Sequence, residues 1–177
     1  MSFEPVWGPN SRAIILGSWP SPKSWEQGFY YSHPQNRFWP LLAALAGEKT
    51  PGSIPEKKAL VLRHGLALWD VLEACDIEGA SDASIKNPVA VDLPGLLEKA
   101  PVRAVFCNGA ASHKLYGKLL EPATGIPAVK LPSTSPANAS FNRRRNSGTR
   151  SWSRVTPAAK AWPPNRANKS AQACMAS

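Results

Sequence analysis

The sequence predicts an α/β fold in three layers, α/β/α, with helices on both faces of a short, mainly parallel central sheet. Three short apolar runs have the length of buried strands, namely 12–17, 102–107 and 128–131. Helical patterns lie between these runs, and strands that alternate with helices are typical of parallel sheets. Ligands of such sheets bind beyond the carboxyl ends of the strands, so the loops after Gly17 and Leu131 are the most informative.

The first half of the chain starts with the strand that ends in Gly17. A long loop follows over 18–35, because this stretch carries Pro20, Pro22, Pro34 and several serines. Asn36 is placed to cap a helix that reaches Gly47, and Pro40 falls in its first turn, where proline is tolerated. A second helix covers 55–64 and ends at Gly65, and 66–72 forms a short strand or a turn.

The second half repeats the alternation. Asp92 caps a helix over 92–100, which precedes the strand 102–107 and a further helix over 109–120. The strand 128–131 then enters a polar loop, 132–138.

A change of composition sets the domain boundary at Ala139. At 177 residues with 43% hydrophobic side chains, one domain is expected, and we place it at 1–139. Residues 140–177 are rich in Arg, Asn, Ser, Pro and Ala without a sustained apolar period, so we expect a disordered, basic tail. The alternatives are a functional basic arm and a frameshift that replaced a native C-terminal helix.

The net charge of +9 resides almost wholly in that tail. Residues 1–139 hold 13 Lys and Arg against 12 Asp and Glu, whereas residues 140–177 hold 8 Lys and Arg and no acidic residue. A basic balance usually indicates a polyanionic partner, but here the domain itself is nearly neutral. Its motifs must therefore carry any assignment to nucleic acid.

Several classes of protein lack support in the sequence. Cys75, Cys107 and Cys174 are scattered, which disfavours a disulfide framework, a zinc site and an iron–sulfur cluster. No apolar run could span a bilayer, and the N-terminus lacks a signal-peptide core. We expect a cytoplasmic monomer, nucleoid-associated if bacterial, without metal, cofactor or membrane partner.

Aromatic residues gather in the first informative loop and just after it. Seven of the fifteen aromatic residues of the chain are Trp19, Trp25, Phe29, Tyr30, Tyr31, Phe38 and Trp39. Aromatic faces stack on bases, and a neighbouring amide can read a base edge. The alternative is a place in the core, which we favour for Phe38 and Trp39, whereas Trp19 and Tyr31 are the better candidates for a ligand.

The second informative loop is Leu131-Pro-Ser-Thr-Ser-Pro-Ala-Asn-Ala139. A polar loop stiffened by proline suits contacts with phosphate, or a wedge between base pairs. An ordinary turn after a strand is the alternative.

Four segments, taken together and in order, resemble the hypoxanthine-DNA glycosylase (DNA-deoxyinosine glycosylase) branch of the uracil-DNA glycosylase superfamily. They are Gly17-Ser-Trp-Pro20, His33-Pro-Gln-Asn-Arg-Phe-Trp39, His64-Gly-Leu-Ala-Leu-Trp-Asp-Val-Leu72 and Leu131-Pro-Ser-Thr-Ser-Pro-Ala-Asn138. The second is also similar to mismatch-specific uracil-DNA glycosylases. The resemblance covers roughly residues 10–139.

The resemblance implies a three-layer fold, base flipping and hydrolysis of an N-glycosidic bond in DNA that contains a deaminated base. Hypoxanthine is the expected base and uracil a second one. A glycosylase that acts mainly on uracil is one alternative. The other is a catalytically impaired paralogue that only binds nucleic acid.

The resemblance also implies roles for single residues. Asn36 corresponds to the catalytic amide, which holds water or polarises the base; a plain helix cap is its alternative role. Trp19 stands where the mismatch-specific relatives carry an asparagine that positions water, while the deoxyinosine branch is apolar there too. Tyr31 corresponds to the aromatic residue that stacks on the flipped base. The implied base-binding residues are Gly17, Ser18, Trp19, Pro20 and Tyr31.

The expected DNA contacts come mainly from the second loop. They are Ser133, Thr134, Ser135, Pro136 and Asn138, together with Ser21, His33 and Ser112. Ser112 belongs to the start of the helix after the second strand, where backbone N–H groups could hold a phosphate, and for His33 a structural hydrogen bond is the alternative. The sequence departs from the family after the second loop, because 141–146 offers no amphipathic helix to pack on the sheet.

Overall fold

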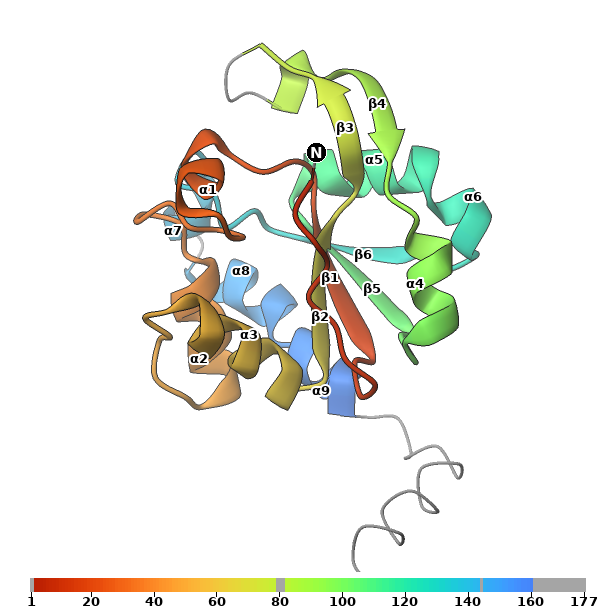
Figure 1. Ribbon diagram of the computed structural model, residues 1–177. Coiled ribbons are helices and arrows are strands. Elements are labelled where there is room, and N and C mark those ends of the chain that lie inside the picture. The colour runs from red at the N-terminus through yellow and green to blue at the C-terminus, as the bar shows by residue number, and fades with distance from the viewer. Residues whose placement is uncertain (1, 79–81, 144, 161–177) are drawn as a thin grey trace, which may run out of the picture.

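The computed structural model describes residues 2–78, 82–143 and 145–160 and contains a four-stranded parallel sheet (Figure 1). The strand order is β2-β1-β5-β6. The bounds are Ala13–Gly17 for β1, Leu66–Asp70 for β2, Ala104–Asn108 for β5 and Ala128–Leu131 for β6. The registers are parallel throughout, with Gly17 opposite Asp70 and Asn108 opposite Leu131. All four carboxyl ends therefore meet at one edge of the sheet.

The central strand β1 is buried on both faces. Ala13 and Ile15 belong to one hydrophobic cluster, whereas Ile14 and Leu16 belong to another. Because alternate side chains of a strand point to opposite faces, two separate cores are possible only with helices on both sides of the sheet. The predicted three-layer α/β/α fold is confirmed.

The helices divide between the two faces (Figure 1). The helices α2 (Phe38–Ala46), α3 (Ile54–Arg63), α8 (Arg145–Trp152) and α9 (Val155–Lys160) lie on one side, and α4 (Leu93–Lys99), α5 (Ala110–Leu119) and α6 (Glu121–Thr124) on the other. Asp92 caps α4 through the N–H of Gly95, as the sequence predicted. No helix in the described part of the chain is long and apolar enough to cross a membrane.

Several elements were not expected. The predicted loop 18–35 contains the short helix α1 (Pro22–Gln27), because the hydroxyl of Ser21 accepts a hydrogen bond from the N–H of Ser24 and caps its start. Beyond β2, the chain forms an antiparallel hairpin of β3 (Leu72–Asp76) and β4 (Lys86–Ala90), joined in part by a short 3-10 helix over Asp82–Ser84. Figure 1 shows this hairpin projecting beyond the carboxyl end of the sheet.

The prediction of a disordered tail from residue 140 onward is wrong for residues 140–160. Residues 140–160 form α7 (Ser140–Arg143), α8 and α9, and three of their apolar side chains are buried in the core beside α2 and α3. These are Trp152, Val155 and Ala159. These three buried side chains are enough to hold the helices despite their polar composition, because tertiary packing supplies most of the stability of a helix. Residues 161–177 lie outside the described residues.

Candidate functional site

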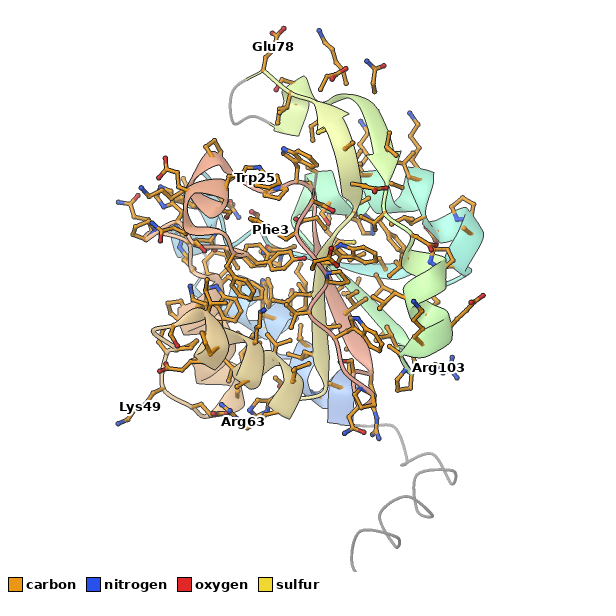
Figure 2. The ribbon with its side chains drawn as sticks, in the orientation of Figure 1. Phe3, Trp25, Lys49, Arg63, Glu78 and Arg103 are labelled. Atoms are coloured by element: carbon orange, nitrogen blue, oxygen red, sulfur yellow. The ribbon has the colours of Figure 1, made fainter. Side chains whose placement is uncertain are left out.

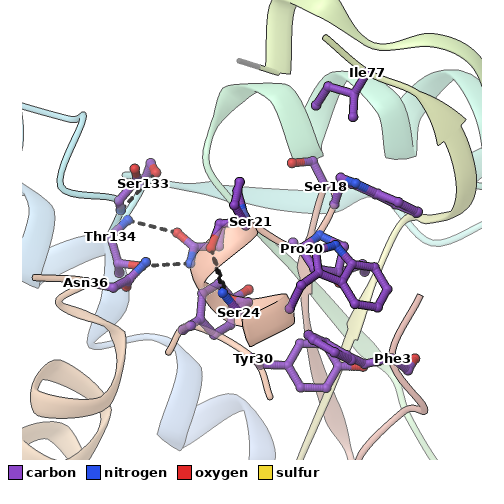
Figure 3. Close-up of a pocket in the computed structure, with 18 residues that line it drawn as sticks. Phe3, Ser18, Pro20, Ser21, Ser24, Tyr30, Asn36, Ile77, Ser133 and Thr134 are labelled. Atoms are coloured by element: carbon purple, nitrogen blue, oxygen red, sulfur yellow. Dashed lines mark hydrogen bonds between the residues drawn. The ribbon is translucent and has the colours of Figure 1, made fainter. Parts of the chain in front are cut away.

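A pocket of about 350 Å³ lies at the carboxyl ends of the parallel strands. Gly17 ends β1, Asp70 ends β2 and Asn108 ends β5, and the loop Ser133–Ser135 follows β6. Figure 3 shows Ser133, Thr134 and Asn36 on one side of it and Pro20, Tyr30 and Phe3 on the other. The two loops that the sequence singled out therefore face each other across one cavity.

One wall of the pocket is aromatic. The ring centroid of Trp19 lies 5.8 Å from that of Trp25, and Trp25 lies 4.8 Å from Phe3. Figure 2 shows Phe3 and Trp25 side by side. Phe3 in turn meets Tyr30, whose hydroxyl donates to the carbonyl oxygen of Glu4 at 2.8 Å. A wall of rings suits a planar, poorly hydrated ligand such as a nucleobase.

Tyr31 contributes its hydroxyl as well as its ring. The ring stacks on Phe38 with 4.0 Å between centroids, so one of its two faces is already covered. The hydroxyl oxygen is buried and, among the described residues, has no hydrogen-bond partner of good geometry. Tyr31 also has a φ of 52°, a conformation that non-glycine residues seldom adopt, and such strain is often found at functional sites.

Asn36 sits where the first motif meets α2. Its Oδ1 accepts a hydrogen bond from the N–H of Phe38 at 3.0 Å, the first N–H of α2. The N-cap of α2 is however Arg37, which makes no side-chain cap of its own, so the predicted cap at Asn36 is displaced by one residue. The Asn36 side chain is half-buried and lines the pocket. Because Oδ1 is engaged by Phe38, the Nδ2 group is the end of the amide that we expect to meet a ligand.

The opposite wall is held by a pair of hydrogen bonds between Asn108 and Thr134. Nδ2 of Asn108 donates to Oγ1 of Thr134 at 2.9 Å, and Oδ1 accepts from the N–H of Thr134 at 3.0 Å. This pair fixes the second motif against the end of β5. Thr134 has no exposed surface, so the structure does not support the DNA contact that the sequence suggested for its side chain.

Arg37 joins the two motifs. Its Nη1 donates to the carbonyl oxygen of Ser135 at 3.0 Å, and its backbone N–H donates to the carbonyl oxygen of Thr134 at 3.1 Å. The guanidinium also lies over the ring of Phe141, 5.0 Å from the centroid. The arginine of the first motif thus positions the loop that follows β6.

The rest of the second motif is a tight, self-bonded turn. Oγ of Ser133 accepts from the N–H of Ser135, and Nδ2 of Asn138 donates to the carbonyl oxygen of Ser133 at 2.9 Å. Ser133, Ser135, Pro136 and Asn138 all remain half-exposed. A turn of this kind can present its backbone and hydroxyl groups to phosphate without rearranging.

The remaining expected contacts have mixed outcomes. Ser21 is exposed and lines the pocket, while His33 is half-buried outside it and accepts at Nδ1 from the N–H of Gln35 at 3.1 Å. Ser112 is only 1% exposed and donates to the carbonyl oxygen of Leu16 at 2.8 Å. The structure therefore argues against Ser112 as a phosphate ligand, because its hydroxyl ties α5 to β1. The implied base-binding residues Gly17, Ser18, Trp19 and Pro20 all line the pocket.

Asp70 is a pocket residue that sequence reasoning missed. It is 3% exposed, and a Cβ added at Gly17 would lie 2.4 Å from its Oδ1, so a side chain at position 17 would have to displace this carboxylate. The signal available was an acidic residue at the end of an apolar run, in a segment that also carried the family resemblance. The side-chain roles of Arg37 and Asn108 were missed as well, because their partners in the second motif lie 98 and 26 residues away along the chain.

Burial and Asp70 together shape the electrostatics of the site. Burial is the largest cause that raises the pKa of Tyr31, and the negative charge of Asp70 raises it further. The pKa of Tyr30 is raised for the same two reasons. Both phenols are therefore hydrogen-bond donors at neutral pH. In the described part of the chain, no group of three or more His, Cys, Asp or Glu is arranged to hold a metal ion.

Comparisons with known proteins agree on one family. The model described as "Uracil DNA glycosylase superfamily" matches residues 5–162. The chain is 36% identical over 146 residues to "Hypoxanthine DNA glycosylase" of Methanosarcina acetivorans and 35% identical over 148 residues to the protein of that name from Methanosarcina barkeri. Each alignment covers 82% of this chain and 92% of the relative.

A solved structure gives the same result. The solution NMR structure of a candidate uracil DNA glycosylase from Methanosarcina acetivorans is similar, with a TM-score of 0.74 and 32% sequence identity. The match covers 90% of this chain and 97% of that one.

Proposed function

The chain belongs to the uracil DNA glycosylase superfamily, and on that basis we propose that it is a monofunctional DNA glycosylase that releases hypoxanthine, with uracil as a second substrate. Two relatives at 36% and 35% identity carry the name hypoxanthine DNA glycosylase. Their similarity favours hypoxanthine over uracil as the main substrate.

The observation that carries the proposal is that one pocket joins both motifs. The loop after β1 supplies the aromatic wall with Trp19, the start of α2 supplies Asn36, and the loop after β6 supplies Ser133 and Ser135. An enzyme that acts on a base in DNA must take the base out of the stack and enclose it. The aromatic wall would stack on the flipped base, while the turn after β6 would grip the backbone or enter the duplex.

The reaction requires little from the protein beyond placement and charge stabilisation. The bond from N9 of hypoxanthine to C1′ breaks, its electron pair leaves with the base, and the sugar passes through an oxocarbenium-like state. The oxygen of a water molecule then bonds to C1′, one proton of that water is lost, and the departing base gains one. Asn36 would donate from Nδ2 to the leaving base or to the attacking water. In the proposed mechanism, Asn36 is therefore the catalytic amide.

The lining of the pocket also supports hydrolysis without lyase chemistry. An imine with the sugar would need an amine nucleophile, and no lysine lies among the described residues that line the pocket. Abasic DNA is the expected product.

The test is a base-release assay on duplexes with a single deoxyinosine, deoxyuridine or deoxyadenosine. The wild-type protein should release hypoxanthine fastest and leave adenine in place. Asn36→Ala removes the hydrogen bond to the first N–H of α2 as well as the amide, so Asn36→Asp is the sharper variant, because a carboxylate still accepts from the N–H of Phe38. Both variants should lose at least about 100-fold in rate, the scale for one lost transition-state donor.

Gln27→Glu makes the same change of an amide to a carboxylate at an exposed position and should leave the rate unchanged. Wild-type rates in both Asn36 variants would show that the amide takes no part in the reaction. A folded wild-type protein that binds DNA but releases neither hypoxanthine nor uracil would establish the non-catalytic alternative.

A further inference from the structure

Asp70 and Tyr31 meet at the inner end of the pocket. Asp70 ends β2 directly opposite Gly17 in the sheet register and is 3% exposed, whereas Ser21 and Trp25 at the pocket mouth are exposed. A Cβ on Gly17 would lie 2.4 Å from Oδ1 of Asp70 and 3.1 Å from the hydroxyl oxygen of Tyr31. A carboxylate and a phenol therefore converge on the same point, and the missing side chain of Gly17 makes room for both.

The two groups have opposite hydrogen-bonding character. An ionised carboxylate only accepts, and a phenol that keeps its proton can donate. Together they form an acceptor next to a donor, fixed at the deep end of a pocket with an aromatic wall.

Deamination creates the complementary pattern. Hypoxanthine presents an N1–H donor beside its O6 acceptor, and uracil presents N3–H beside O4. Adenine presents the reverse, because N1 is a bare acceptor beside an amino group. Resting on the function proposed above, we propose that Asp70 and Tyr31 recognise this edge, with Asp70 accepting from N1–H of hypoxanthine and the Tyr31 hydroxyl donating to O6. The bare N1 of adenine would face the Asp70 carboxylate without a proton between them, and the enzyme would reject it.

A carboxylate in a glycosylase pocket could instead take the proton of the attacking water. That reaction occurs at C1′, which stays attached to the DNA backbone at the pocket mouth, whereas the base enters most deeply. The 3% exposure of Asp70 places its carboxylate with the base rather than with the sugar. Burial and the charge of Asp70 also raise the pKa of Tyr31, which keeps its hydroxyl a donor.

Both DNA binding and base release must be measured, because a residue that recognises the base affects binding, whereas a residue that takes a proton from water affects only release. The ligands are duplexes that contain 2′-fluorinated deoxyinosine, whose N-glycosidic bond resists hydrolysis, or a tetrahydrofuran abasic site. Asp70→Ala and Tyr31→Phe should each weaken binding to the deoxyinosine duplex by at least about tenfold, the scale of one lost hydrogen bond to a charged or buried partner. Both should bind abasic DNA like the wild type.

Asp70→Asn is the decisive variant, because its amide oxygen can still accept from N1–H but cannot take a proton from water. Recovery of most of the affinity and release rate in Asp70→Asn would support base recognition. Glu73→Gln, which removes an exposed carboxylate from β3, is the control for charge.

Three results would overturn the inference. Wild-type affinity for the deoxyinosine duplex in Asp70→Ala, with release equally abolished in Asp70→Ala and Asp70→Asn, would assign the carboxylate to water. An equal loss on abasic DNA would indicate a merely structural role. Wild-type behaviour of Asp70→Ala in both assays would leave the residue without a role, while normal hypoxanthine release by the wild type would keep the proposed function intact.

Discussion

The indole N–H of Trp152 donates a hydrogen bond to the carbonyl oxygen of Pro132 at 2.9 Å. Trp152 ends α8, and Pro132 begins the loop that follows β6, so this bond ties the C-terminal helices to the second motif. The ring is fully buried and meets Phe38 edge to face, with 5.8 Å between centroids. The helices α8 and α9 are thus part of the structure that shapes the pocket.

Substitution of Trp152 should lower stability in two separable steps. Trp152→Phe keeps most of the buried ring but leaves the Pro132 carbonyl without its donor, and should cost about 1–3 kcal/mol. Trp152→Ala also opens a cavity and should cost about 3–5 kcal/mol. Urea unfolding measures both, with Trp25→Phe at an exposed position as the control. An alanine variant as stable as the wild type would contradict the packing of α8.

Truncation should separate the helices from the residues that follow them. A chain that stops after residue 160 loses only Arg166 and Lys169 among its basic residues and should keep its melting temperature and its DNA affinity. The slope of log affinity against log salt concentration should then change by less than about 2. A chain that stops after residue 139 loses Trp152, Val155 and Ala159 from the core and should not fold cooperatively.

The alternative of a basic arm makes the opposite prediction for the chain that stops after residue 160. A large loss of DNA affinity and of salt dependence in the 1–160 chain would show that residues 161–177 contact the phosphate backbone.

The core and the caps of the helices were predictable from local sequence. The run Ala13–Gly17 is apolar and short, and the structure makes all of it a buried central strand. Asp92 was identified as a cap because its side chain bonds to an N–H three residues away. The bond from Asn36 to the N–H of Phe38 is equally local, although the N-cap of α2 is Arg37. Such interactions depend only on neighbours in the chain, which a sequence displays directly.

The missed elements depend on distant partners. The segment Leu72–Asp76 is mostly exposed, so it lacks the apolar alternation that identifies a strand. The helix α8 has a polar sequence, and a single tryptophan at its end anchors it in the core. The spacing of residues 155 and 159 was the available signal, since two positions four apart share one face of a helix, here α9. Asp70 gained its place in the site only because β2 lies beside β1.

The buried thiol of Cys107 should make stability fall at high pH. Burial raises the pKa of this thiol from its ordinary value of 9.0 to about 11. Above pH 9 the unfolded chain loses this proton while the folded protein keeps it. The stability that the folded protein owes to the protonated thiol is therefore fully present below pH 9 and is lost as the pH rises through about 11. The free energy of unfolding should fall by up to about 3 kcal/mol over this window.

Cys107→Ala should flatten the decline relative to the wild type, whereas Cys75→Ala, at a partly exposed thiol, should leave it unchanged. Identical pH profiles of the wild type and Cys107→Ala would refute the assignment.

Arg37 should act on DNA binding through the second motif rather than as a phosphate ligand. Its Nη1 is engaged by the carbonyl oxygen of Ser135, and its guanidinium covers Phe141. Arg37→Lys keeps the charge but loses the planar group that reaches both partners, and Arg37→Met loses the charge as well. Both variants should therefore weaken binding to undamaged, deoxyinosine and abasic duplexes by the same factor, because the displaced loop is common to all three complexes. Neither should change the slope of log affinity against log salt, because a charge used inside the protein releases no counterion from DNA.

A slope lower by about 1 in Arg37→Met, with the slope retained in Arg37→Lys, would instead show a direct phosphate contact. Fluorescence anisotropy titrations at several salt concentrations distinguish the two outcomes.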